Sequence, residues 1–361
     1  MDGLGLFTEG SFKHIVASNP TVDFIFIFDR EPHLDFIFGN NVTAKVIGPQ
    51  ARHPFLYMVW YGISLKRLLK KIKPDIFVGT NGMIPLKIKT KTLSVIHDLN
   101  FEHHPEHLPK IIRRYYCKYF PKFANNADRI ASVSEFSKKD IVDTYKIDSN
   151  KIDVVYNGPN EHFKPIHQEE KIEIQRKYSE GKPFFLFVGT LHPRKNLVNL
   201  FKAFNEFKSQ TKSDFKLLIV GRKMWWTDEI ETTFQNLEFK SDIIFAGRLP
   251  EEELYKITAA AHALTYVPIF EGFGIPLVEA MSCGTPVITS NITSMPEVVE
   301  DAGFLVDPFS VEDITQAMIT ISTDDNLRNK LIEKSKVQAK KFSWQKTGDR
   351  LWHSILKTMK E

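Results

Sequence analysis

Short, uninterrupted apolar runs alternate with longer segments of helical period along this chain of 361 residues. Runs such as 184–188 (Phe-Phe-Leu-Phe-Val) and 216–220 (Lys-Leu-Leu-Ile-Val) do not alternate apolar with polar residues, so both faces of each strand are expected to be buried. Strands of that kind form parallel sheets that helices cover on both faces. The pattern therefore predicts an α/β protein built from doubly wound units.

The apolar runs fall into two series, and a polar stretch that begins at Asn157 and continues through the charged segment 167–183 separates them. A length of 361 residues agrees with about two domains. Strands are predicted at 22–28, 75–79, 93–97, 129–133, 152–156, 184–188, 215–220, 243–246, 263–267 and 286–289. Helices are predicted at 55–72, 108–124, 135–145, 197–209, 251–260 and 311–322.

Composition excludes several classes of protein. The net charge of +4 is too small to indicate nucleic acid as a partner, and two cysteines make no disulfide framework or metal pattern. No apolar run approaches the roughly 20 residues of a membrane span, and no signal segment opens the chain. A cytoplasmic location is expected.

Basic residues gather in two early stretches, 66–73 and 110–120, where Lys and Arg interleave with apolar and aromatic residues at helical spacing. Two interpretations stay open. The stretches are amphipathic helices with solvated basic faces, or they form a face that rests peripherally on an anionic membrane surface.

The most informative segment is 268–281, which follows a predicted strand. Gly272 and Gly274 allow close approach of the backbone to a ligand, and the helix that starts near Pro276 would aim the free N–H groups of Leu277 and Val278 at an anion. The carboxylates in this segment, Glu271 and Glu279, can each accept two hydroxyls, as a sugar or ribose presents them. The alternative is a capping carboxylate and a surface charge.

Two further strand ends carry candidate residues. In 187–196, Arg194 and Lys195 sit at a strand–helix turn, where a guanidinium and an ammonium can neutralise a diphosphate or simply form an exposed basic turn. In 95–98, His97 and Asp98 end a buried strand, either for function or to close a loop. The nearby histidines match no strong zinc pattern, so no metal is expected; they are His103, His104 and His107.

These strings resemble those of retaining glycosyltransferases of family 4, which have the fold called GT-B. The resemblance covers nearly the whole chain and includes 97–98, 133–137, 156–158, 189–196, 245–248, 271–279 and 342–344. It implies two Rossmann-like, doubly wound domains that face a cleft. Residues 1–160 would form the acceptor-side domain and 161–341 the nucleotide-sugar domain, with the final helix in 342–361 packing back on the first domain.

The resemblance also implies roles for matching residues. Glu279 would hold the ribose hydroxyls, Glu271 the donor-sugar hydroxyls, and His97 would lie beside the transferred sugar. The cations of Arg194 and Lys195 would hold the diphosphate, together with backbone amides. The further implied donor-binding positions are Gly3, Gly5, Gly189, Thr190, Gly272, Phe273, Gly274, Leu277 and Val278.

The function implied by the resemblance is retaining, metal-independent transfer of a hexose from a nucleotide-diphosphate sugar, with no cofactor. The acceptor would be a glycan or lipid-linked, as in cell-surface polysaccharide synthesis. Two alternatives are a non-catalytic subunit that binds a nucleotide sugar and another GT-B enzyme, such as an epimerase or a phosphorylase.

The sequence differs from the family pattern at two places, and each difference leads to a further expectation. Thr190 stands where many members have Arg, so Arg194 would supply that charge. Only Met1 and Asp2 precede Gly3, where the family opens with a full strand before a glycine turn. The sequence leaves open whether the first strand of the N-terminal domain is missing.

Overall fold

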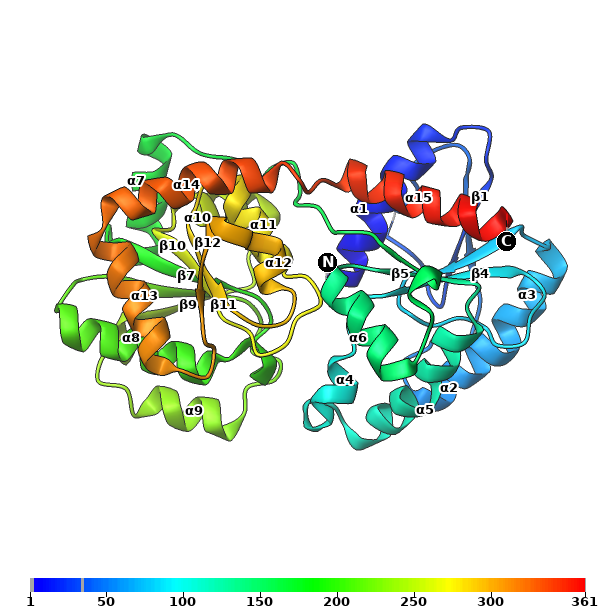
Figure 1. The fold of residues 1–361 in the computed structure, drawn as a ribbon, viewed down its shortest axis with the longest axis horizontal. Coiled ribbons are helices and arrows are strands. Elements are labelled where there is room, and N and C mark those ends of the chain that lie inside the picture. The colour runs from blue at the N-terminus through cyan, green and yellow to red at the C-terminus, as the bar shows by residue number, and fades with distance from the viewer. Residues whose placement is uncertain (1–2, 34–35, 361) are drawn as a thin grey trace. The chain divides into compact units, whose positions relative to one another are not determined.

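The computed structural model describes residues 3–33 and 36–360, which form two compact units. Unit 1 comprises Met1–Gly158 and Ser343–Glu361, and unit 2 comprises Pro159–Phe342 (Figure 1). The division falls two residues before the boundary expected from the sequence, and the C-terminal helix belongs to unit 1. The question of a missing first strand concerns Met1 and Asp2. These two residues lie outside the described residues.

Unit 2 contains a six-stranded parallel sheet with the order β12-β11-β10-β7-β8-β9. Its first strand in the sequence, β7, therefore lies in the middle of the sheet. The strands are β7 (Phe184–Val188), β8 (Lys216–Val220), β9 (Ile243–Gly247), β10 (Ala263–Tyr266), β11 (Val287–Ser290) and β12 (Gly303–Val306).

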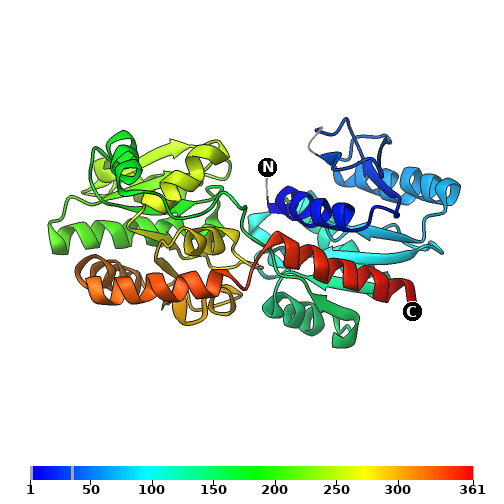
Figure 2. The same ribbon diagram turned by 90° about the horizontal axis from the view of Figure 1, so that it is seen from above.

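Helices cover both faces of this sheet (Figures 1 and 2). They are α7 (Gln168–Ser179), η5 (Pro193–Lys195), α8 (Leu197–Thr211), α9 (Asp228–Gln235), η6 (Lys240–Asp242), α10 (Glu251–Ala260), α11 (Ile275–Ser282), α12 (Met295–Val299), η7 (Glu300–Ala302), α13 (Val311–Thr323) and α14 (Asp325–Ala339). Phenylalanines of β7 and α8 are fully buried between sheet and helix, and each contributes about 1.5–3 kcal/mol by its burial. The six with no exposed surface are Phe184, Phe185, Phe187, Phe201, Phe204 and Phe207.

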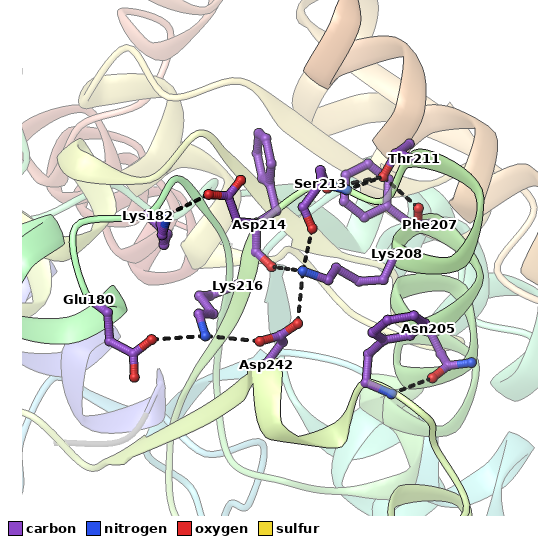
Figure 3. A network of polar contacts seen from close by, with 12 residues as sticks. Glu180, Lys182, Asn205, Phe207, Lys208, Thr211, Ser213, Asp214, Lys216 and Asp242 are labelled. Carbon is purple, nitrogen blue, oxygen red and sulfur yellow. Dashed lines mark hydrogen bonds and ion pairs between the residues drawn. The ribbon is translucent and has the colours of Figure 1, made fainter.

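An ion-pair network around the buried Lys208 lies at the amino end of the same sheet (Figure 3). Asp242, just before β9, contacts Lys208 of α8 at 2.8 Å and Lys216 of β8 at 2.9 Å. Lys208 also donates to the Phe215 carbonyl at 3.1 Å, and Lys216 pairs with Glu180 at 3.0 Å. Burial alone would raise the pKa of Asp242, but the hydrogen bonds with both lysines bring it below its ordinary value.

Unit 1 contains two parallel sheets among its described residues, one of two strands (β1-β2) and one of four (β3-β4-β5-β6). The strands are β1 (Phe24–Phe28), β2 (Val42–Val46), β3 (Ile76–Gly79), β4 (Lys91–Ile96), β5 (Arg129–Ser132) and β6 (Ile152–Val154). The helices are α1 (Gly3–Ser18), α2 (Pro54–Val59), η2 (Trp60–Ser64), α3 (Leu65–Ile72), α4 (Asn100–His103), η3 (Pro105–His107), α5 (Lys110–Asn126), α6 (Glu135–Tyr145), η4 (Ser149–Lys151) and α15 (Trp344–Lys360).

The first and last helices of the chain, α1 and α15, lie side by side in unit 1 (Figures 1 and 2). Gly10 permits this contact, because a Cβ there would lie 2.3 Å from Cδ2 of Trp344. Hydrogen bonds then join α15 to the segment at β6: Ser354 donates to Asp153 at 2.9 Å, and Thr347 donates to the Tyr156 carbonyl at 2.6 Å. The last helix therefore packs within unit 1.

Most of the predicted elements are present, and two helices begin and end at the predicted residues, 135–145 and 251–260. The predicted helix at 55–72 is divided into α2, a π-helical turn and α3. One expectation is wrong: Gly3 and Gly5 do not form a glycine turn but lie in the first turns of α1. Among the elements that periodicity did not predict are α1, β2, α4, α9, α12, β12 and α14.

Candidate donor-binding site

The predicted donor residues of unit 2 come from the carboxyl ends of two adjacent strands, β7 and β10. The turn η5 follows β7 and carries Arg194 and Lys195, and the loop after β10 carries Glu271. Ile269 of that loop donates its N–H to the Arg194 carbonyl at 2.9 Å. This bond joins the two loops, so residues about 76 positions apart in sequence meet at one edge of the sheet.

One carboxylate oxygen, Oε1 of Glu271, accepts hydrogen bonds from both Arg194 Nη1 and Lys195 Nζ. The Arg194 guanidinium also donates to the Phe270 carbonyl at 3.3 Å. Lys195 donates to the Tyr266 hydroxyl, and its ammonium lies 4.9 Å from the centre of that ring. The result is a group of two cations and one anion with a net positive charge, in which Lys195 and Glu271 are buried and Arg194 is partly exposed.

Burial would raise the pKa of Glu271, yet the positive charges of Arg194 and Lys195 hold it below its ordinary value. Glu271 is therefore ionised at neutral pH. Only 7 % of Glu271 and 8 % of Lys195 is exposed, so the pair is largely shielded from water and its charges interact strongly.

Residues that the sequence did not single out support this group. The Ser294 hydroxyl donates to the Glu271 carbonyl at 2.9 Å, and the Asn196 side-chain amide donates to the carbonyls of Val267 at 3.0 Å and Pro308 at 2.7 Å. Asn196 has a left-handed backbone (φ 61°), a conformation that Asn tolerates better than most residues. Asn196 directly follows the Arg-Lys pair, so its position in the sequence could have identified it as a site residue. Ser294 comes from a distant loop, which the periodicity of the sequence could not connect to the site.

The glycine turn before α11 has the geometry that the sequence predicted. Gly274 adopts φ 88°, and a Cβ there would lie 2.9 Å from Met295 Cε, so only glycine fits without displacement. One detail is corrected: the N–H of Leu277 is not free but donates to the Gly274 carbonyl at 3.0 Å.

Glu279 lies on α11 and is 92 % buried, given its exposure of 8 %. Within residues 3–33 and 36–360, no hydrogen bond or ion pair satisfies its carboxyl group. Burial, with a smaller contribution from the negative charge of Glu251, raises the pKa of Glu279 to about 8. A buried carboxyl group of this kind can meet ligand hydroxyls as acceptor or donor.

The remaining candidates of unit 2 lie in the same two loops. Gly189 donates its N–H to the Val220 carbonyl at 2.9 Å, which fixes the turn after β7 to the end of β8, and Thr190 is exposed. Gly272 and Phe273 are buried in the loop before α11, where the Phe273 ring packs against Phe342 at 5.5 Å.

His97, Gly3 and Gly5 belong to unit 1, and the structure describes them within that unit alone. The Nε2 atom of His97 lies 2.9 Å from the Thr80 carbonyl, so this nitrogen carries the proton. The His97 ring meets the ring of Phe7 edge to face at 5.0 Å, which places the start of α1 beside the end of β4. Asp98 accepts from the Asn100 N–H at 3.1 Å in the loop after β4.

One group of the described residues has spacing suited to a metal ion. The ligand atoms of His104, Glu106 and His107 all lie within 4.8 Å of one another in the segment between α4 and α5. Oε1 of Glu106 lies 3.3 Å from Nδ1 of His104 and 3.6 Å from Nε2 of His107. This group is in unit 1, whereas the cation–carboxylate group that suits a donor diphosphate is in unit 2.

Comparison with known proteins agrees with this geometry. Residues 13–162 match Glycosyltransferase Family 4, and residues 168–338 match Glycosyl transferases group 1. O-antigen chain mannosyltransferase B of Escherichia coli is 31 % identical over 278 residues, which is 77 % of this chain and 73 % of that protein. An O-antigen chain mannosyltransferase of Salmonella typhimurium is 28 % identical over 316 residues, 85 % of this chain and 84 % of that protein.

Solved structures show the same fold at low sequence identity. A glycosyltransferase from Rickettsia africae has a TM-score of 0.76 at 19 % identity, covering 98 % of this chain and 95 % of that one. HepE of Anabaena in complex with UDP-glucose has a TM-score of 0.77 at 15 % identity, covering 97 % and 96 %. The two matched regions, the identity to the Escherichia coli enzyme and the two Rossmann-like units lead to one conclusion. The chain belongs to the family 4 glycosyltransferases of the GT-B fold.

Proposed function

We propose that this glycosyltransferase moves a hexose from a nucleotide-diphosphate sugar to a growing glycan, with retention of anomeric configuration and without a metal ion. The observation that carries the proposal is the convergence of Arg194 and Lys195 on Glu271 at the carboxyl edge of the unit 2 sheet. Ligands of open parallel sheets bind at this edge.

The chemistry follows from the charges of this group. Cleavage of the sugar–phosphate bond leaves negative charge on the diphosphate, and fixed cations in a shielded site stabilise that charge. A guanidinium has five N–H donors and an ammonium three, so Arg194 and Lys195 can bind phosphate oxygens while keeping a bond to Glu271. The departing phosphate then accepts the acceptor's proton, and the acceptor attacks from the same face.

Mannose is the hexose that we propose for the donor, in the synthesis of a cell-surface polysaccharide. The support is similarity to O-antigen mannosyltransferases of two organisms, each of which matches most of this chain. The carboxyl groups of Glu271 and Glu279 would then bind sugar and ribose hydroxyls, in the roles that the family resemblance implies.

A transfer assay tests the proposal directly. The purified chain is incubated with GDP-mannose, UDP-glucose, UDP-galactose or UDP-N-acetylglucosamine and a mannose-terminated, lipid-linked acceptor, in the presence of EDTA. We expect transfer from GDP-mannose, with the donor's α configuration in the product as read by NMR. A β-linked product would contradict retention, and loss of turnover in EDTA would contradict a metal-free reaction.

We also propose that unit 1 contacts an anionic membrane surface where the acceptor is lipid-linked. No helix in the described part of the chain has the length and apolar character needed to cross a bilayer. The helices α2 and α5 lie side by side (Figure 1), and large apolar side chains are exposed on them: Phe55 at 61 %, Met58 at 41 % and Ile111 at 52 %. Exposed basic residues of α5 accompany them, namely Lys110, Arg113, Arg114, Lys118 and Lys122.

A further inference from the structure

A short turn in unit 1 gathers three side chains that can bind a metal ion. The 3-10 turn η3 follows α4, and His104 is its N-cap residue. A 3-10 helix has three residues per turn, so His104 and His107, three positions apart, lie on the same side of it. The His107 N–H donates to the His104 carbonyl at 3.0 Å and closes the turn. The two imidazole rings are therefore stacked, with their centres 5.1 Å apart, and Glu106 reaches both of them.

The ligand atoms of these three residues have nearly the separations that a tetrahedral ion requires. Bonds of about 2.0–2.2 Å to a tetrahedral zinc ion place neighbouring ligand atoms about 3.3–3.6 Å apart. From Oε1 of Glu106, the distances to Nδ1 of His104 and Nε2 of His107 are 3.3 Å and 3.6 Å. All the ligand atoms lie within 4.8 Å of one another. The ring planes differ by only 17°, so one ring must rotate before both nitrogens point at a common ion.

The exposure of the three side chains permits both this rotation and the entry of an ion. The His104 side chain is 27 % exposed and that of Glu106 is 63 % exposed, so both can turn without displacing the core. The His107 side chain is only 8 % exposed, and its ring is held by its surroundings. One fixed ligand and two adjustable ligands at the surface are thus available to an ion from solution.

Contacts on both sides hold the backbone of this turn in place. Before the turn, Nε2 of His103 lies 2.7 Å from Oδ1 of Asp140, which joins α4 to α6. Phe101 of α4 is buried in the main core cluster of unit 1, and Leu108, directly after the turn, packs against the same cluster. Because the backbone is held at both ends, binding an ion requires only side-chain movement, and the cost of ordering the site is small.

We propose that His104, Glu106 and His107 bind one divalent transition-metal ion, such as Zn²⁺, through two imidazole nitrogens and one carboxylate oxygen. Imidazole suits zinc, nickel and copper, whereas magnesium and calcium take oxygen ligands. Three protein ligands leave a fourth tetrahedral position for water. The ion would fix the turn between α4 and α5. It has no part in the transfer chemistry proposed above, so either proposal can fail without the other.

Calorimetric titration of the full, untagged chain tests the site after EDTA treatment and dialysis. We expect about one Zn²⁺ to bind per chain and Mg²⁺ not to bind there. His104→Ala and Glu106→Gln should each weaken Zn²⁺ binding at least about tenfold, because changing even an outer-shell partner costs about 10–100-fold in metal affinity. The matched control is His353→Ala on the exposed surface of α15, which should bind Zn²⁺ as wild type does.

A second measurement identifies the ligands without any substitution. X-ray absorption of the zinc-loaded wild-type chain should show two imidazole nitrogens and two oxygens at about 2.0–2.2 Å. Zinc should also raise the melting temperature of wild type and of the His353 variant, but not that of His104→Ala. Failure of wild type to bind Zn²⁺ would mean that the three residues form only a hydrogen-bonded cluster, and would overturn the proposal. Equal affinity in wild type and both site variants, or a spectrum without imidazole, would also overturn it.

Discussion

The ammonium of Lys195 and the carboxylate of Glu271, 76 residues apart in the chain, form an ion pair that is buried in unit 2. The same carboxylate oxygen also holds the guanidinium of Arg194, so one anion positions both cations of the proposed diphosphate site. Because each partner is oriented by the other, changes at any of the three should alter charge and geometry together.

Replacing Lys195 with methionine should lower kcat by about a hundredfold to a thousandfold, the usual loss when one preorganised group that stabilises transition-state charge is removed. The remaining charge of Arg194 should preserve some activity. Transfer kinetics with GDP-mannose measure the loss, and circular dichroism checks folding. The matched control is Lys202→Met on the exposed surface of α8, where kcat should stay within about twofold of wild type. Equal rates in the two variants would contradict the role of Lys195.

Glu279→Gln should stabilise the chain at high pH. Because the pKa of Glu279 is raised from 4.5 to about 8 in the folded state, folding favours its protonated form. The stability that the protonated carboxyl group gives to the folded state is fully present below pH 4.5. It is lost as pH rises through about 8, at about 1.4 kcal/mol per pKa unit. The glutamine variant lacks this loss. Its melting temperature should therefore exceed that of wild type at pH 8.5 and match it near pH 4.5.

The same variant should bind the donor more weakly, because an amide oxygen is a poorer acceptor for ribose hydroxyls than a carboxylate. Calorimetry with GDP at pH 8.5 measures the change. Tighter binding by the variant, or a constant difference in melting temperature from pH 4.5 to 8.5, would argue against a perturbed, ligand-binding carboxyl group.

Asp242→Asn should destabilise unit 2 by roughly 1–3 kcal/mol, because it leaves the buried Lys208 with a weakened partner. The pKa of Asp242 is lowered in the fold, so its contribution is present above the ordinary value of 3.8 and is lost as pH falls through the lower folded value. Urea unfolding should show a larger difference in stability between the variant and wild type at pH 7 than at pH 2.5.

The control for this network is Asp214→Asn, whose carboxylate pairs with Lys182 but is 67 % exposed. Exposed pairs contribute about 0–1 kcal/mol, so this variant should stay near wild type. Equal destabilisation by the two substitutions would mean that burial does not set the strength of the network.

Gly10→Ala should destabilise unit 1 by about 1–3 kcal/mol, because the new methyl group would lie 2.3 Å from Trp344 and force α1 and α15 apart. Thermal unfolding followed by tryptophan fluorescence measures the effect. Gly62→Ala is the comparison, since a Cβ at that position meets nothing within 4 Å. A melting temperature of the Gly10 variant at or above that of the Gly62 variant would contradict close packing of these helices.

Reversing the charge of Lys118 and Lys122 should weaken binding to phosphatidylserine vesicles by about 30-fold or more, since each basic residue near the surface contributes about 1 kcal/mol. Vesicle flotation at low and high salt measures the affinity. The matched control reverses Lys202 and Lys212, two exposed lysines of unit 2. Identical flotation of the two double variants, or binding that salt does not weaken, would argue against α5 as the docking surface.

The amino-acid sequence by itself determined the fold class, because continuous apolar runs such as 184–188 require strands that helices bury on both faces. It also determined the positions of Arg194, Lys195 and Glu271 at strand ends, since a change from strand to helical period marks a turn. Helix limits with strong local signals were predicted too, as at α6, where the Ser134 side chain accepts the Ser137 N–H at 2.9 Å.

Tertiary structure alone decided what those residues contact. Distant strands bring together the loops on which three features depend. Two cations share one Glu271 oxygen, Tyr266 approaches Lys195, and Ser294 supports the group. It also decided that Gly3 and Gly5 lie in a helix, because packing of α1 against α15 outweighs the weak helix propensity of glycine. Local sequence specifies elements and their ends, whereas contacts across the sheet follow from strand order, which no single segment encodes.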